Sequence, residues 1–245
     1  MNPISPDRFD AVLFDLDGVL TATAKVHAAC WKKLFDEFLE ERAKAAGEPL
    51  KPFDIDSDYK LYVDGKLRYE GVRSFLGSRG IDLPEGTPDE SPNSETVCGL
   101  GNRKDALVHE VLEADGVEVY EGSVRLVEQV RSRGIRTAVV SASKNCKIVM
   151  EAARISHLFD QVVDGEVAER LRLPGKPKPD TFLTAAERLG VVPERAVVVE
   201  DAISGVQAGR AGGFGLVIGV DRKGDPESLR KSGADIVVKD LSELV

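Results

Sequence analysis

The sequence has few aromatic residues, few cysteines and no long apolar segment. Aromatic residues make up 6% of the 245 residues and hydrophobic residues 42%, which is typical of a globular protein rather than a disordered or fibrous one. The three cysteines, Cys30, Cys98 and Cys146, are odd in number and lack the spacing of a metal site, which favours a reduced compartment over a disulfide framework. No apolar run reaches the roughly 18 residues that cross a membrane, and the N-terminus lacks a signal-peptide pattern. We therefore expect a cytoplasmic protein with no membrane partner.

The sequence also lacks an excess of positive charge. Its 33 Lys and Arg residues against 42 Asp and Glu residues give a formal net charge of −9. Binding of a polyanion draws on basic patches that release counterions, so this balance argues against a nucleic-acid partner. An anionic small substrate needs only a few cations placed close to it. A chain of this length forms either one large domain or a core with a smaller partner domain, and we expect the second.

The chain is organised around the stretch from Phe9 to Thr21. Residues 11–14 form a short apolar run, long enough for a buried strand, and the run ends at two carboxylates, Asp15 and Asp17. In an extended chain these two side chains point the same way, so both can face one metal ion. Gly18 then allows the backbone to turn sharply next to a ligand.

The remaining chain divides into a helical part and an alternating part. From residue 119 onward strands and helices alternate, which predicts a parallel sheet wrapped by helices. Within residues 24–115, three stretches show helical periodicity instead, while residues 51–62 are polar, so we expect a mainly helical insert there, between core segments 1–23 and 116–245. Residues 82–101 contain three prolines and three glycines and are predicted to be a loop. The predicted strands are 137–141, 161–163, 196–199, 216–218 and 236–238, and the predicted helices are 25–46, 68–77, 104–114, 123–133, 145–153, 179–189, 204–211 and 226–232.

Two segments suit the binding of a phosphoryl group. Ser141 and Ser143 come at the carboxyl end of a predicted strand, where ligands collect in open parallel sheets, although a serine there is more often a helix cap. Lys176 is followed by a proline that disfavours helix at the lysine. A cation held in this way suits an anionic ligand, although Pro179 can simply initiate a helix.

A last pair of acids, Glu200 and Asp201, follows the predicted strand at 196–199. Adjacent acids at such a place are normally part of a solvated loop or a helix cap. In a parallel sheet, however, all strand ends lie at the edge that also holds Asp15 and Asp17. Converging carboxylate oxygens are what an octahedral Mg²⁺ ion requires, so the sequence predicts a magnesium site.

These segments, in this order and spacing, resemble the haloacid dehalogenase (HAD) superfamily of phosphotransferases over essentially the whole chain. Residues 15–19, Asp-Leu-Asp-Gly-Val, with Thr21 are the most specific part of the match. The run Thr23–Trp31, the segment Ser141–Asn145 and the pair Glu200–Asp201 are most similar to the β-phosphoglucomutase subgroup. The resemblance implies an α/β fold with a Rossmann-like HAD core, a parallel sheet and a helical cap domain inserted after the first strand.

The resemblance also implies roles for the core residues. Asp15 is expected to be the nucleophile that forms an aspartyl phosphate. Asp17 is expected to act as acid and base, while its backbone carbonyl joins Asp15 and Asp201 on Mg²⁺ and Glu200 supports or shares that coordination. The expected ligands of the transferring phosphoryl group are Ser141 and Lys176, and Ser143 and Asn145 are expected to bind substrate.

In the insert, the resemblance implies a second set of residues. Thr23 and His27 stand where the subgroup couples cap closure to the acid and base, although a lone His at the start of a helix is more often a surface residue. Arg68 matches the arginine that grips the second, non-reacting phosphate, a task that suits a planar bidentate fork. Arg103 or Lys104, taken as opening a cap helix, supplies a further cation.

Three functions follow as alternatives. The first is a Mg²⁺-dependent, monomeric mutase that converts β-glucose 1-phosphate to glucose 6-phosphate, and the second is a phosphatase that gives the phosphoryl group of a sugar phosphate to water. The third is a sugar-phosphate binding module without turnover, which is disfavoured because Asp15, Asp17, Lys176 and Asp201 are all present. Two departures weaken the assignment of the sugar: Ala22 stands where many relatives have an acid, and the loop at 82–101 is long.

Overall fold

The computed structural model describes residues 3–47 and 51–245, which form two units. The core unit comprises the chain up to Thr23, Gly65–Leu67 and Val117–Val245, and the helical unit comprises Ala24–Asp64 and Arg68–Gly116. The short segment Gly65–Leu67 therefore interrupts the helical unit and packs with the core. A Cβ atom on Gly65 would lie 2.5 Å from the Ser204 hydroxyl, so only glycine fits this close approach.

The core unit is built on a parallel sheet, as predicted. Six strands lie in the order β3-β2-β1-β4-β5-β6, and all five neighbouring pairs are parallel. β1 is central, with Ala11 opposite Arg136 in β2 and opposite Ala196 in β4. The carboxyl ends of these strands consequently share one edge. The strands are β1 (Ala11–Phe14), β2 (Arg136–Val140), β3 (Gln161–Val163), β4 (Ala196–Glu200), β5 (Leu216–Val220) and β6 (Ile236–Val238).

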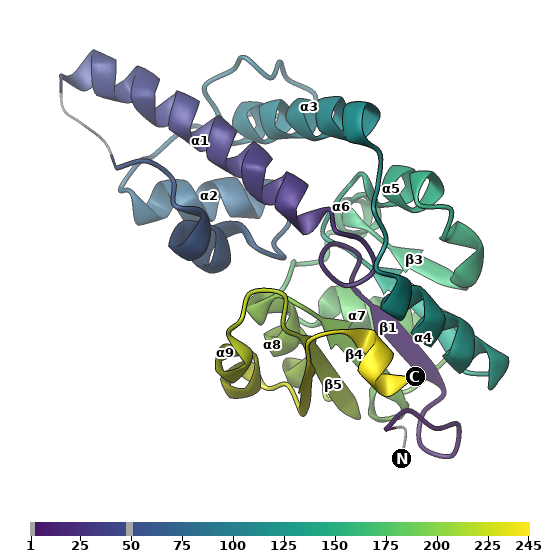
Figure 1. Ribbon diagram of the computed structural model, residues 1–245. Helices are drawn as coiled ribbons and strands as arrows, with labels where there is room; N and C mark the ends of the chain where they lie inside the picture. The colour runs from purple at the N-terminus through teal and green to yellow at the C-terminus, as the bar shows by residue number, and fades with distance from the viewer. Residues whose placement is uncertain (1–2, 48–50) are drawn as a thin grey trace. The chain divides into compact units, whose positions relative to one another are not determined.

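Helices of the core unit cover this sheet (Figure 1). Apolar side chains on α7 and α8, including Phe182 and Val206, join Leu13 and Val198 of the central strands in one buried cluster. α4 contacts β2 and the C-terminal 3₁₀ turn Leu241–Leu244. The helix α6 is absent from the sequence-based prediction. The core helices are α4 (Glu121–Ser132), α5 (Cys146–Ala152), α6 (Gly165–Leu171), α7 (Asp180–Leu189), α8 (Ile203–Ala211) and α9 (Pro226–Ser232).

The helical unit has an aromatic core of its own. Its elements are α1 (Ala24–Ala46), a π-helical segment η1 (Ile55–Val63), α2 (Arg68–Ser78) and α3 (Val97–Asp115). Phe35 of α1 lies at the centre, with its ring centroid 4.0 Å from that of Phe75, 5.3 Å from Phe53 and 5.2 Å from Trp31. Such ring pairs add about 0.5–1.5 kcal/mol each beyond area burial. These four rings come from α1, α2 and the chain just before η1, and they form the centre of the helical unit.

Two parts of the sequence-based prediction for this unit are wrong. α3 begins at Val97, not at residue 104, because the Thr96 hydroxyl caps it by accepting the Gly99 N–H at 2.9 Å. The predicted loop at 82–101 therefore ends at Thr96. The second correction is η1, whose polar sequence gave no helical signal, although Asp54 caps it through the Ser57 N–H at 2.7 Å.

Two smaller observations concern the cysteines and the helices. All three cysteines are free thiols and are buried. Among the helices formed by residues 3–47 and 51–245, none combines the length and apolar character needed to cross a membrane.

Candidate active site

A buried ion-pair cluster lies at the carboxyl edge of the sheet. Asp15 directly follows β1, and Glu200 ends the neighbouring strand β4, so sheet register places both acids side by side. The Lys176 ammonium lies between them, with Nζ 2.6 Å from Asp15 Oδ1, 2.6 Å from Glu200 Oε1 and 3.1 Å from the Val140 carbonyl. Lys176 is 2% exposed and Glu200 is fully buried. A charge so buried persists only when it is paired in this way.

The cluster is short of positive charge. Burial raises the pKa of Asp15 well above its usual value, and although Lys176 opposes this, Glu200, Asp17 and Asp201 add to it. Burial lowers the pKa of Lys176, but the carboxylates of Asp15 and Glu200 raise it by more, so the ammonium stays protonated. One ammonium among four carboxylates leaves room for a further cation.

Three of these acids can hold a metal ion. Asp15, Glu200 and Asp201 are all buried, and each offers a carboxylate oxygen within 4.8 Å of the others. Glu200 is oriented by the N–H groups of Asp201 and Ala202, both 3.1 Å from its Oε2. Gly18 lets the Asp201 carboxylate pack directly against the turn, because a Cβ atom there would lie 2.2 Å from Asp201 Oδ2. Hard carboxylate oxygens without nitrogen or sulfur ligands fit Mg²⁺.

Hydroxyl groups surround the carboxylate of Asp17. Thr23 donates a hydrogen bond to Asp17 Oδ1, and Ser141 Oγ lies 3.4 Å from Asp17 Oδ2. Because Thr23 uses its one hydroxyl hydrogen on Asp17, Thr21 donates its own to Thr23, with 2.7 Å between the two hydroxyl oxygens, and the Leu16 carbonyl lies 3.2 Å from the Thr21 hydroxyl. The structure therefore brings Thr23 and Ser141 to Asp17, and it adds Thr21 to the predicted set.

The loop after β2 is ordered by its own serines. Ser141 Oγ accepts the Ser143 N–H at 3.1 Å, and Ser143 Oγ accepts the Asn145 N–H at 3.1 Å, which are local turns typical of serine. The loop rests on the start of α6, because a Cβ atom on Gly165 would lie 2.8 Å from the Ala142 carbonyl oxygen. The same loop carries Lys144, which pairs with Glu169 at 2.7 Å. The residue that caps α5 is Asn145, so neither Ser141 nor Ser143 is the helix cap that a serine after a strand more often is.

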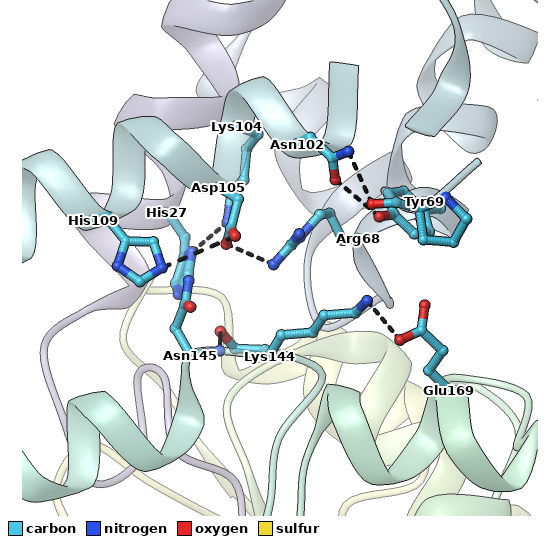
Figure 2. A network of polar contacts seen from close by, with 12 residues as sticks. His27, Arg68, Tyr69, Asn102, Lys104, Asp105, His109, Lys144, Asn145 and Glu169 are labelled. Atoms are coloured by element: carbon cyan, nitrogen blue, oxygen red, sulfur yellow. Dashed lines mark hydrogen bonds and ion pairs between the residues drawn. The ribbon is translucent and has the colours of Figure 1, made fainter. Parts of the chain in front are cut away.

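In the helical unit, α1 and α3 bring His27 and Lys104 together (Figure 2). Lys104 Nζ lies 2.6 Å from His27 Nδ1 and 5.2 Å from the centroid of the Trp31 ring. Both side chains are buried, with 8% and 7% of His27 and Lys104 exposed. The interpretation of His27 as an ordinary surface histidine is therefore wrong.

Arg68, at the start of α2, is bound to α3 (Figure 2). Its Nη2 lies 2.5 Å from Asp105 Oδ1, and 11% of the Arg68 side chain is exposed. The next residue, Tyr69, donates its hydroxyl to Asn102 of α3 at 2.9 Å. These contacts give the guanidinium a fixed place on the helix that also carries Lys104.

Arg103 points to a different part of the unit. Its Nε donates to the Pro92 carbonyl at 3.0 Å, so it supports the loop before α3. Because α3 begins at Val97, Arg103 and Lys104 are its seventh and eighth residues and do not open the helix. The prediction that either residue acts through the N-terminal end of a helix is wrong for that reason.

A family model described as haloacid dehalogenase-like hydrolase matches residues 9–213. The chain belongs to this family. A β-phosphoglucomutase of Mycobacterium bovis is 50% identical over 243 residues, which are 98% of this chain and 93% of the relative. A β-phosphoglucomutase of Bacillus subtilis is 30% identical, covering 96% of this chain and 91% of the relative. A solved β-phosphoglucomutase structure from Clostridium difficile is similar with a TM-score of 0.73 and 26% identity, covering 97% of this chain and 93% of that one.

Membership in the HAD family confirms the predicted resemblance, the α/β fold and the enzyme class. The match includes Asp15, Lys176 and Asp201 within one family model. Two residues escaped the sequence reasoning. Thr21 lies inside the first motif, but the sequence does not indicate which residue its hydroxyl contacts. Asp105 was not predicted because an acid on an amphipathic helix normally faces solvent.

Proposed function

We propose that this HAD-family protein is a β-phosphoglucomutase that interconverts β-glucose 1-phosphate and glucose 6-phosphate with Mg²⁺. The 50% identity with the mycobacterial β-phosphoglucomutase across 98% of the chain supports the substrate class. The observation that carries the proposal is the position of the Lys176 ammonium, 2.6 Å from both Asp15 and Glu200. A nucleophilic carboxylate held beside a fixed cation is the arrangement that an aspartyl-phosphate mechanism requires.

The two aspartates of the first motif divide the chemistry between them. Asp15 attacks phosphorus to form an aspartyl phosphate, while Asp17 gives its proton to the departing sugar oxygen. In the reverse half, Asp17 takes the proton of the acceptor hydroxyl, whose oxygen attacks the aspartyl phosphate and restores the Asp15 carboxylate. Thr23, bonded to Asp17 Oδ1, holds this carboxyl group in place.

Cations and donors around Asp15 stabilise the transferring group. Lys176 and the Ser141 hydroxyl bind the phosphoryl oxygens, and Lys176 reduces the repulsion between those oxygens and the Asp15 carboxylate. Mg²⁺, held by Asp15 and Asp201 with support from Glu200, supplies the remaining neutralising charge when bound.

A second group of residues is assigned to the non-reacting phosphate and the sugar. On the core unit these are Ser143 and Asn145, and on the helical unit they are Arg68 and Lys104. Arg68 meets Asp105 through one nitrogen, Nη2, so other N–H groups of its fork are directed elsewhere and suit a phosphate. Arg103, which contacts Pro92, is the weaker candidate for this task.

A phosphatase is the second candidate, because the matching family model is one of hydrolases. The same Asp15 and Asp17 chemistry hydrolyses the sugar phosphate if water replaces the acceptor hydroxyl. The two functions differ only in the acceptor of the phosphoryl group. They are therefore distinguished by their products.

We test the proposal with β-glucose 1-phosphate, Mg²⁺ and a trace of β-glucose 1,6-bisphosphate, following glucose 6-phosphate and inorganic phosphate together by ³¹P NMR. A mutase forms glucose 6-phosphate much faster than inorganic phosphate, and removal of Mg²⁺ with EDTA stops the reaction. Release of phosphate at the rate of substrate loss supports the phosphatase instead. Absence of both products contradicts the proposed substrate.

Arg68→Ala is expected to separate substrates by size. Loss of a charge-assisted hydrogen bond of about 1.5 to 3 kcal/mol lowers kcat/KM for the hexose phosphate by roughly ten- to a hundred-fold. Hydrolysis of acetyl phosphate, which has no second phosphate, should hardly change. Arg73→Ala is the matched control, since Arg73 lies on the same helix in an exposed pair with Glu85 at 2.9 Å. Equal losses on both substrates would show that Arg68 supports the fold instead.

A further inference from the structure

Arg222 connects three distant segments of the core unit. It follows β5, and its Nε donates to the Gly18 carbonyl at 2.8 Å, across 204 residues of sequence. Nη1 donates to the Lys239 carbonyl at 3.1 Å and lies 3.4 Å from Asp240 Oδ2. The guanidinium carbon is 3.6 Å from the centroid of the Tyr120 ring, a stacked cation–π contact. Arg222 thus joins the first motif to the chain around Tyr120 and to the C-terminal segment.

The segment that Arg222 holds is the turn that carries Asp17. Gly18 has φ of +91°, and its N–H donates to the Thr21 carbonyl at 2.7 Å. On the other side, the Tyr120 N–H donates to the Leu20 carbonyl at 2.9 Å. The turn is therefore closed on itself, fixed to the chain at Tyr120 and, through one carbonyl, fixed to Arg222.

Gly18, which carries this carbonyl, lies close to two acids of the site, Asp17 and Asp201. Gly18 immediately follows Asp17 and faces Asp201, whose Oδ2 would lie 2.2 Å from a Cβ atom on Gly18. The Gly18 carbonyl belongs to the peptide between Gly18 and Val19, so a displacement of this carbonyl moves the turn, and the Asp17 Cα at the start of the turn moves with it relative to Asp15. Proton transfer in a transition state requires hydrogen-bond distance and alignment, so a small displacement here affects the acid more than the nucleophile.

We propose that Arg222 is a positioning residue that fixes the Gly18 carbonyl and thereby aims the Asp17 carboxyl at the departing oxygen. The inference rests on the proposed role of Asp17 as acid and base. Arginine suits the task because its rigid fork donates to two carbonyls while its flat face stacks on Tyr120. A lysine ammonium at this place donates to the Gly18 carbonyl but offers no plane to stack.

The leaving group of the substrate provides the test. The alkoxide of a sugar phosphate needs a proton from Asp17 to depart, whereas the nitrophenolate of p-nitrophenyl phosphate departs without one. General acid catalysis contributes about 10²- to 10⁴-fold. For Arg222→Ala we expect single-turnover phosphorylation of Asp15 to slow by about ten-fold or more with β-glucose 1,6-bisphosphate, and by less than about three-fold with p-nitrophenyl phosphate. Arg222→Lys should recover part of the difference.

Controls keep the outcome interpretable. If Arg222→Ala does not fold, Arg222→Lys takes its place in the test. Melting followed by circular dichroism shows whether each variant is folded. Arg210→Ala is the matched control. Arg210 also donates to a backbone carbonyl, through Nε and Nη2 at 3.1 and 2.7 Å, but this carbonyl is that of Gly233, which is not part of the first motif. Equal slowing with both substrates, or no slowing, overturns the proposal. Failure of the wild-type protein to react with the sugar bisphosphate while it reacts with p-nitrophenyl phosphate contradicts the proposed function, and the same comparison with an alkyl phosphate then tests Arg222.

Discussion

Asp15→Asn is expected to abolish phosphoryl transfer while the protein remains folded. The amide has nearly the shape of the carboxylate and retains an Oδ1 that accepts a hydrogen bond from Lys176. In the present structure Lys176 Nζ lies 2.6 Å from Asp15 Oδ1. It is, however, a poor nucleophile, and loss of a nucleophile reduces kcat by about four orders of magnitude or more. The measurement is kcat with the sugar phosphate, together with mass-spectrometric detection of the phosphorylated aspartate, which should disappear.

The matched control is Asp10→Asn at the opposite end of the same strand. Asp10 pairs with Arg195 at 2.6 Å, but both side chains are well exposed, so this variant should keep its activity. The melting temperatures of both variants show whether the sheet is intact. A loss of only a few-fold in Asp15→Asn would contradict the covalent mechanism.

Lys176→Met is expected to damage both catalysis and stability. It removes the buried ammonium from between Asp15 and Glu200, each 2.6 Å away, and leaves two carboxylates without their counter-charge. Breaking a buried pair in this way lowers the free energy of unfolding by about 3–5 kcal/mol. Loss of the cation beside the phosphoryl group lowers kcat by a further 10²- to 10³-fold or so. Urea unfolding followed by circular dichroism measures the first effect, and steady-state kinetics the second.

The pH dependence of the stability of Lys176→Met shows whether the deficit comes from the lost counter-charge. Burial raises the pKa of Asp15, and Lys176 is the group that opposes this. Without the ammonium, folded Asp15 takes up a proton more readily than the unfolded chain does, so stability increases as pH falls. The deficit of Lys176→Met should therefore be smaller in acid than at neutral pH. Lys178→Met, at an exposed position two residues on, should show neither effect, and a pH-independent deficit would indicate lost packing instead.

Much of the core site was predictable because each strand is indicated by its own short apolar run, and because the carboxyl ends of parallel strands share one edge. Short apolar runs ending in Asp15 and Glu200 predict buried strands, and the parallel pairing of β1 with β4 then brings both acids to one edge. Lys176 belongs to the same cluster because its sequence context restricts its backbone and its charge needs a partner. These inferences depend only on the strands being parallel, not on their order in the sheet.

Other contacts were not predictable because they depend on side-chain packing between distant segments. The pair of Arg68 and Asp105 joins two helices through residues 37 positions apart, and neither sequence context differs from an ordinary exposed helix face. Arg222 follows a strand in a short polar turn, and nothing in that sequence context indicates its contact with Gly18, 204 residues away. The start of α3 was placed too late because Thr96 and Val97 follow a proline-rich stretch that conceals the cap.

The central position of β1 has a consequence for folding during synthesis. β1 is made first, yet its neighbours in the sheet are β2, where Arg136 faces Ala11, and β4, where Ala196 does. At roughly 5–20 residues per second, the ribosome needs about 6–25 s to reach the first of these partners. The apolar residues 11–14 have no strand to pair with during that interval, while the helical unit, whose contacts are mostly nearer in sequence, can form first. Chaperone capture of the nascent chain is accordingly expected to concentrate on its first strand.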